Sequence, residues 1–134
     1  MLDIQDPIQR FLTSLAYGVV GASPRRHKYG NKVLRCYQQN GRRAIPVNPR
    51  EQLIEGATCV ASVLDLPEDV KSISIITPPA VTERVVEEAI RVCEGIIARS
   101  GGDRKVEAIA LRSLAHMHAM RGEFESARDE YRRA

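Results

Sequence analysis

The stretch Tyr17-Gly18-Val19-Val20-Gly21-Ala22-Ser23-Pro24 decides the fold. This short apolar run stops at a glycine and opens into small residues, and a basic segment follows it. In a doubly wound parallel sheet, the first strand leads into such a turn, and the next helix directs unpaired backbone N–H groups at a bound anion. Gly21 permits a sharp turn and lets a ligand approach the backbone, and Ser23 adds a hydroxyl donor. The stretch therefore predicts a phosphate-binding turn; an ordinary strand-to-helix turn without a ligand is the alternative.

The glycines around this turn depart from the G-x-G-x-x-G spacing of dinucleotide-binding folds. Ala22 and Ser23 follow Gly21, and the next glycine is Gly30. We expect the following helix to begin near residues 29–31. A Gly21→Val substitution should abolish ligand binding and leave most of the fold in place, because a β-branched side chain would intrude where the backbone and a pyrophosphate nearly touch.

Positive charge is concentrated around the turn. Residues 7–50 contain no Asp or Glu, and their cationic side chains are Arg10, Arg25, Arg26, Lys28, Lys32, Arg35, Arg42, Arg43 and Arg50. The whole chain has a formal net charge of only +3, so the remainder is net negative. Such a segregated field raises the local concentration of anionic ligands. The aromatic residues of this segment form no RNA-binding signature, so a phosphorylated small molecule fits better than nucleic acid.

Length and composition limit the class of protein. A chain of 134 residues with 43% hydrophobic residues can form one domain, or one small domain with an appendage. Aromatic residues make up only 4%, so the core is expected to be aliphatic. The acidic N-terminus does not resemble a secretion signal, and no apolar run is long enough for a membrane span. We expect a soluble cytoplasmic protein with no membrane partner, in which Cys36, Cys59 and Cys93 are buried reduced thiols.

The order of patterns predicts an α/β fold with a Rossmann-like parallel sheet of about four strands in the order 3-2-1-4. Strands are expected over residues 17–21, 44–47, 58–60 and 72–76, and helices over 6–12, from about 30 to a stop at 39–41, over 61–66, and from 81 onward. Asp6 is expected to cap the first helix. The last strand is apolar and β-branched, as for a strand buried on both faces. Gly21, Val47 and Thr77 would then meet at the carboxyl edge, where open α/β sheets bind ligands.

Five motifs follow one another in the order and spacing of a known family. They are Gly21-Ala22-Ser23-Pro24, Lys28-Tyr29-Gly30-Asn31-Lys32-Val33, Ile45-Pro46-Val47-Asn48-Pro49, Leu64-Asp65-Leu66-Pro67 and Thr77-Pro78-Pro79. Together they resemble the small stand-alone CoA-binding proteins, which are similar to the Rossmann-like CoA-binding domain of the succinyl-CoA ligase alpha subunit. The resemblance covers about residues 6–90. It implies a parallel sheet that holds the nucleotide end of CoA at its carboxyl edge.

The resemblance also implies positions for the ligand contacts. The phosphate turn would be lined by Gly21, Ala22, Ser23 and Pro24, with Arg25, Lys28 and Tyr29 beside it, the adenosine side by Asn48, Pro49 and Arg50, and the far wall by Thr77 and Pro78. A dinucleotide fold that reads a free ribose diol usually has Asp or Glu after the second strand, where this chain has Asn48. Arg50 could pair with the 3′-phosphate of CoA. The residues therefore disfavour NAD as the ligand, and they disfavour NADP less strongly.

The segment after residue 90 departs from the family, which continues into a fifth strand. Here a break at Ser100-Gly101-Gly102-Asp103 precedes two helical stretches, and residues 108–134 resemble one tetratricopeptide repeat. That resemblance rests on Leu111, Leu114, Ala115, Gly122, Phe124, Ala127, Tyr131 and Ala134. We expect a Rossmann-like domain over residues 1–99 and a helical hairpin over 100–134. The hairpin would cover the open sheet edge, form a homodimer with a second copy, or recruit a protein partner.

The sequence contains no recognisable catalytic or metal-binding constellation. Ser23 has no motif nearby that supplies a base and an orienting carboxylate, and His116 and His118 point to different helix faces. We favour non-catalytic binding of CoA or an acyl-CoA. An NADP-dependent or other nucleotide-dependent enzyme and an interaction module with an α/β scaffold are the alternatives.

Overall fold

The computed structural model describes residues 5–99, 101 and 133. The chain divides into two compact units, Met1–Pro78 and Pro79–Ala134. All strands of the described residues belong to the first unit, and a long helix begins the second. The helical hairpin with its tetratricopeptide-like pattern falls on residues outside the described part of the second unit. It stays a prediction, and so does the expected domain boundary near residue 99.

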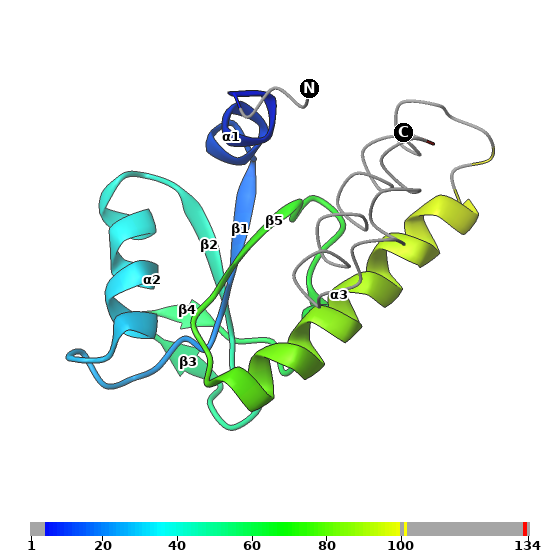
Figure 1. Cartoon of the computed structure of the whole chain (residues 1–134). Coiled ribbons are helices and arrows are strands. Elements are labelled where there is room, and N and C mark those ends of the chain that lie inside the picture. Colours follow the sequence, from blue (N-terminus) through cyan, green and yellow to red (C-terminus); the bar gives the residue numbers. More distant parts are fainter. Residues whose placement is uncertain (1–4, 100, 102–132, 134) are drawn as a thin grey trace. The chain divides into compact units, whose positions relative to one another are not determined.

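The first unit is built on a parallel sheet of three strands (Figure 1), namely β1 (Ala16–Val20), β2 (Arg43–Val47) and β5 (Ser72–Ile75). Their order is β2-β1-β5, and Gly18 of the central strand is in register with Ile45 on one side and Ile73 on the other. Every residue of β1 is buried, whereas β5 is only partly buried. The parallel Rossmann-like arrangement is thus confirmed, and the expectation that the last strand is buried on both faces is wrong.

The expected strand over residues 58–60 is largely replaced by a hairpin. β3 (Leu53–Ile54) and β4 (Ala57–Thr58) pair antiparallel in a separate two-stranded sheet. The place of the missing strand beside β2 is marked by one parallel bridge between Val47 and Val60. Two hydrogen bonds make this bridge, from Val60 N to Pro46 O at 3.0 Å and from Asn48 N to Val60 O at 2.9 Å. The chain therefore pairs with β2 at the expected position, but only through this single bridge.

Three helical segments complete the first unit. α1 (Gln5–Leu12) contains Asp6 inside the helix, so Asp6 is not its N-cap. α2 (Tyr29–Gln39) begins within the predicted range. The segment expected as a helix over residues 61–66 is the short 3-10 turn η1 (Val63–Asp65), in which the Ser62 hydroxyl accepts a hydrogen bond from the amide of Leu64.

The core of the first unit is mostly aliphatic. Its buried cluster consists of Val19, Ala22, Leu34, Ala44 and Ile54. Tyr17 is also buried, stacks on Tyr37 with ring centroids 4.5 Å apart and meets the edge of Phe11 at 5.1 Å. Tyr17 is the one aromatic among the buried hydrophobic residues of the described part of the chain, so the expected aliphatic core is confirmed apart from this aromatic stack.

The second unit begins with α3 (Pro79–Arg99). Four apolar side chains at helical spacing are buried along it, those of Val85, Val86, Ala89 and Ile90. This confirms the predicted long helix with an apolar stripe. Neither α3 nor any other helix of the described residues is both long and apolar enough to cross a membrane.

Candidate functional site

The carboxyl ends of the three parallel strands are joined at one level by backbone hydrogen bonds. The amide of Gly21 donates to the carbonyl of Val47 at the end of β2, at 3.3 Å. The amide of Ile76 donates to the carbonyl of Val20 at the end of β1, at 2.8 Å. The turn after β1 therefore lies between the ends of its two neighbours, as the sequence predicted for Gly21, Val47 and Thr77.

Gly21 makes this close approach possible. Its φ is +89°, a left-handed conformation that favours glycine, and a Cβ at this position would lie 1.9 Å from the carbonyl oxygen of Ile76. The same Cβ would come within 2.9 Å of Thr77 Cγ2, which places Thr77 directly beside the turn. This geometry contradicts the expectation that Gly21→Val leaves most of the fold in place, because any side chain here collides with the backbone of Ile76, directly after β5.

Gly30 is a second close-contact glycine, and the sequence analysis gave it no role. It is the second residue of α2, it is buried, and a Cβ on it would lie 2.0 Å from the carbonyl oxygen of Gly21 and 3.1 Å from the Cα of Ala22. The first turn of α2 thus lies directly against the turn after β1. A glycine at the start of a helix, where good helix formers are usual, was the signal that could have revealed this contact.

The N-terminus of α2 is suited to an anion. Its N-cap residue, Lys28, provides no capping side chain, and the first turn of the helix contains no acidic residue. The first backbone N–H groups of a helix lack partners within the helix, and the helix dipole favours negative charge there. Lys28 is exposed, and Lys32 lies over the ring of Tyr29, 5.1 Å from its centroid. The residues that follow the turn therefore present N–H donors and positive charge together.

Asn48 shapes the turn with its side chain. Its Nδ2 donates to the carbonyl of Ala22 at 2.9 Å, and its Oδ1 accepts from the amides of Arg50 at 2.8 Å and Glu51 at 3.2 Å. The amide thus connects the end of β2 to the turn after β1. Since three hydrogen bonds already use this side chain, its structural role is visible, and its predicted contact with the adenosine side of a ligand stays a prediction.

The remaining predicted site residues lie around this turn with their side chains mostly in solvent. Ala22 is buried, Ser23 and Thr77 are partly buried, and the exposed members are Pro24, Arg25, Lys28, Tyr29, Pro49, Arg50 and Pro78. The Ser23 hydroxyl accepts a hydrogen bond from the amide of Arg25 at 3.1 Å. Within the part of the chain that the structure describes, the side chains of Arg25, Lys28 and Arg50 form no hydrogen bond or ion pair. These cations are therefore available to a ligand.

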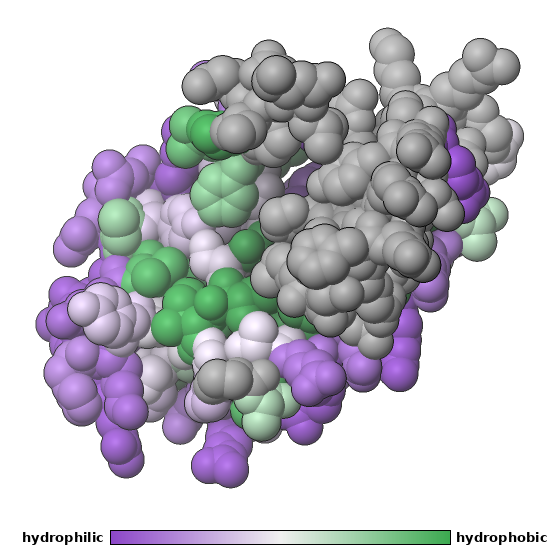
Figure 2. Space-filling view, in the orientation of Figure 1, coloured by the Kyte–Doolittle hydropathy of each residue, from purple (hydrophilic) through white to green (hydrophobic). Residues whose placement is uncertain are grey.

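Hydrophobic and hydrophilic residues separate clearly on the surface. In Figure 2, hydrophobic residues form a patch, and hydrophilic residues occupy the margin where the segment between β1 and α2 lies in Figure 1. The segment between β1 and α2 contains Arg25, Arg26 and Lys28, all of which are exposed.

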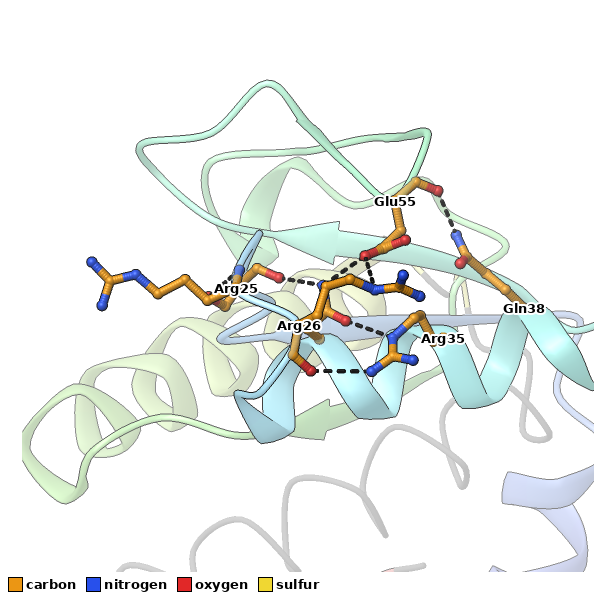
Figure 3. Close-up of polar contacts among 7 residues, drawn as sticks. Arg25, Arg26, Arg35, Gln38 and Glu55 are labelled. Carbon is orange, nitrogen blue, oxygen red and sulfur yellow. Dashed lines mark hydrogen bonds and ion pairs between the residues drawn. The ribbon is translucent and has the colours of Figure 1, made fainter.

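A polar network beside the turn was not foreseen from the sequence. Figure 3 shows Arg26, Arg35, Gln38 and Glu55 converging from the basic segment, α2 and the β3–β4 hairpin. Asn31, which is completely buried, lies between them and donates to the carbonyl of Ser23 at 2.8 Å. Its partners Ser23 and Glu55 come from distant parts of the sequence, so no local motif indicates the network.

Two of the three cysteines have raised pKa values. Burial raises the pKa of Cys93 to about 11, and Glu94 contributes to the increase. Burial, and then the charge of Glu51, raises the pKa of Cys59. Cys36 is exposed, and Cys59 and Cys93 are only partly buried, so the expectation that all three thiols are buried is wrong for Cys36 and met only in part for the other two. Within residues 5–99, no group of three or more His, Cys, Asp or Glu side chains is placed to hold a metal ion.

Comparison with known proteins identifies the family. The sequence model of the CoA binding domain matches residues 16–122. The chain belongs to the CoA binding domain family. The match includes the whole turn, α2, the three parallel strands and α3, and it extends beyond residue 90, where the resemblance described above ends.

Relatives of this CoA binding domain include much larger proteins. The ADP-forming acetate–CoA ligase I of Archaeoglobus fulgidus is 32% identical over 96 residues, which are 71% of this chain and 14% of the ligase. The chain therefore spans about a seventh of that protein. A conserved hypothetical protein from Pyrococcus furiosus is 41% identical with a TM-score of 0.55, covering 57% of this chain and 66% of that one.

A more distant structure shows the fold alone. The dinucleotide-forming acetyl-coenzyme A synthetase 1 of Ca. Korarchaeum cryptofilum in its apo form is 22% identical, with a TM-score of 0.62, and the match covers 82% of this chain and 26% of that one. The similarity confirms the Rossmann-like fold of this CoA binding domain.

Proposed function

We propose that this chain binds CoA or an acyl-CoA without catalysing a reaction, with the phosphates at the turn after β1. The observation that carries the proposal is the contact between Gly30 and Gly21, where a Cβ would lie 2.0 Å from a carbonyl oxygen. This contact sets the N-terminus of α2, which has neither a capping side chain nor an acidic residue in its first turn, directly against the turn. An oxygen-rich phosphate is the group that such N–H donors bind well.

The residues present fit the nucleotide end of CoA. When bound, CoA would supply a pyrophosphate and a 3′-phosphate, and the acyl chemistry would reside on its thiol. Arg25 and Lys28 carry uncommitted cations after the turn, and Arg50 carries another after β2. A guanidinium can form a bidentate pair with a phosphate monoester, so Arg50 is the residue we assign to the 3′-phosphate. Thr77 and Pro78 would bound the site on the side of β5.

Family membership supports the ligand class, and the larger relatives do not decide the activity of this chain. The acetate–CoA ligase from Archaeoglobus fulgidus is about seven times as long as the segment it shares with this chain. Among the described residues, the thiols of Cys59 and Cys93 have raised pKa values, which disfavours the reactive thiolate. We therefore infer that the described part of the chain binds a ligand and does not catalyse a reaction.

Isothermal titration calorimetry tests the proposal directly. The purified chain is titrated with CoA, acetyl-CoA, dephospho-CoA, NADP and NAD at one salt concentration. We expect the tightest binding for CoA and acetyl-CoA, weaker binding for dephospho-CoA, and none for NAD. Tighter binding of NADP than of CoA would instead support a nucleotide-dependent enzyme, and absence of CoA binding would refute the proposal.

A further inference from the structure

Glu55 has a backbone conformation that its residue type disfavours. It has φ of 50°, and with Gly56 at 75° it forms the two-residue turn of the β3–β4 hairpin. Such turns need two left-handed residues, for which Asn-Gly and Gly-Gly are preferred. A non-glycine residue held in a rare conformation indicates that the surrounding structure makes use of it.

The side chain and the backbone of Glu55 are bound to three residues of the segment between the turn and the end of α2. Its Oε1 accepts a hydrogen bond from Asn31 Nδ2 at 3.0 Å and lies 3.4 Å from Arg26 Nε. Gln38 Nε2 donates to the Glu55 carbonyl at 3.1 Å (Figure 3). The hairpin tip is therefore fixed to both the basic segment and α2.

These contacts extend to the phosphate turn. The same Asn31 Nδ2 that binds Glu55 also donates to the carbonyl of Ser23, and Asn31 Oδ1 accepts from Arg35 Nε at 2.7 Å. Arg35 in turn donates to the carbonyl of Arg26 at 3.1 Å. Residues 23 and 26 are thus both tied to the network. The side chain of Arg25, which lies between them, extends away from it (Figure 3).

We propose that Glu55 is a positioning residue of the ligand site, and that its carboxylate, acting through Asn31 and Arg26, holds residues 23–28 in the conformation that receives the phosphates. This inference rests on the proposed function. It divides the cations of the segment into two groups: Arg26 and Arg35 maintain the shape of the turn, and Arg25 and Lys28 face the ligand.

The direction in which one substitution changes the ligand affinity distinguishes this role from simple electrostatics. A carboxylate near an anion site repels the anion, so on charge alone its removal strengthens binding. If the carboxylate instead orders the segment, its removal weakens binding, because the ligand must then order residues 23–28 itself. Glu55→Gln suits this test, because it removes the charge and retains an oxygen that can accept from Asn31.

The first measurement is the rate of trypsin cleavage in the absence of ligand. Trypsin cleaves after Arg25, Arg26 and Lys28 when this segment opens, and mass spectrometry assigns each cut. We expect Glu55→Gln to accelerate cleavage at these sites about three- to ten-fold. Asp69→Asn is the matched control: it removes one charge from the ion pair between Arg43 and Asp69, where Arg43 begins β2 at the amino edge. Equal cleavage in the two variants would overturn the proposal.

The second measurement is the affinity for CoA. Glu55→Gln should weaken binding about three- to ten-fold, whereas Asp69→Asn should leave it unchanged. Glu55→Asn adds a variant that cannot simply be unfolded, because Asn-Gly suits the hairpin turn better than Glu-Gly. We expect its melting temperature to equal or exceed that of the unchanged chain while its affinity falls.

Each outcome bears on a different claim. Equal or tighter CoA binding by Glu55→Gln and Glu55→Asn would overturn the role of Glu55 and leave the proposed function standing. Failure of the unchanged chain to bind CoA would overturn both. A Glu55→Gln, Arg26→Gln double variant that binds no more weakly than the weaker single variant would support action through Arg26, and additive losses would overturn it.

Discussion

The two glycine turns at opposite edges of the parallel sheet differ in what surrounds them. Gly21 follows β1 at the carboxyl edge, Gly41 precedes β2 at the amino edge, and both are left-handed, with φ of 89° and 66°. A Cβ at Gly41 would meet no atom of the described residues within 4 Å, whereas one at Gly21 would lie 1.9 Å from Ile76 O. Both positions need glycine for their conformation. Only the carboxyl edge also needs it for the approach of neighbouring backbone.

The two edges also differ in how their cations are paired, although Arg42 at the amino edge is exposed and has no side-chain partner within the described residues. At the amino edge, Arg43 forms an ion pair with Asp69. At the carboxyl edge, Arg25, Lys28 and Arg50 have exposed side chains that form no hydrogen bond or ion pair within the described residues. An unpaired cation beside uncapped helix N–H groups attracts anions. The comparison therefore supports the proposed ligand site at the carboxyl edge, and four substitutions with two control variants test it.

Gly21→Ala should have the largest effect. It combines strain at positive φ with overlap against Ile76, so we expect the free energy of unfolding to fall by about 3 kcal/mol or more. CoA binding should be lost, because the turn must move to admit the methyl group. Urea denaturation measures the first effect and calorimetry the second.

Gly41→Ala is the control for Gly21→Ala. It imposes strain of the same kind with open space around the new methyl group, and should cost about 1 kcal/mol. Its affinity for CoA should be unchanged. If the two variants lose equal stability, then crowding at the carboxyl edge is not what distinguishes the two turns.

Gly30→Ala should have the next largest effect. Whether it raises or lowers the free energy of unfolding is informative. Alanine is the better helix former by about 1 kcal/mol, so propensity alone predicts a more stable protein. We expect the opposite, a loss of about 1 to 3 kcal/mol with weaker CoA binding, because the methyl group would lie 2.0 Å from Gly21 O. Among the described residues, a methyl group on Gly95 in α3 would meet only the flexible Arg99 side chain, so Gly95→Ala should not destabilise the protein. A stabilised Gly30→Ala variant would contradict the packing of α2 against the turn.

The contrast also shows what the sequence could and could not predict. The apolar run up to Val20 and the glycine after it predicted β1 and its turn, because strand propensity and a chain reversal are local properties. The β3–β4 hairpin was missed because Glu55-Gly56 lacks the usual Asn-Gly signature. The network of Asn31 was also missed, since its partners Ser23 and Glu55 are 8 and 24 residues away along the chain.

Arg50→Ala should have a smaller, ligand-specific effect at the carboxyl edge. Loss of a charged hydrogen bond to the 3′-phosphate should weaken CoA binding by about 1 to 3 kcal/mol. Dephospho-CoA lacks that phosphate, so its affinity should hardly change. Calorimetry with both ligands makes the comparison, and stability serves as the control because the Arg50 side chain is exposed. Equal losses for the two ligands would place Arg50 away from the 3′-phosphate.

Asp69→Asn should have the smallest effect, because it acts at the amino edge. The side chains of Arg43 and Asp69 are 51% and 45% exposed, and solvent-exposed ion pairs contribute about 0.2 to 1 kcal/mol. We therefore expect the free energy of unfolding to fall by no more than about 1 kcal/mol, with the difference shrinking at high salt as the pair is screened. The affinity for CoA should not change, since Arg43 begins the strand whose far end carries Asn48 and Arg50. A clear loss of CoA affinity in Asp69→Asn, measured by the same titration, would show that the two edges are coupled and that the ligand site is not confined to the carboxyl edge.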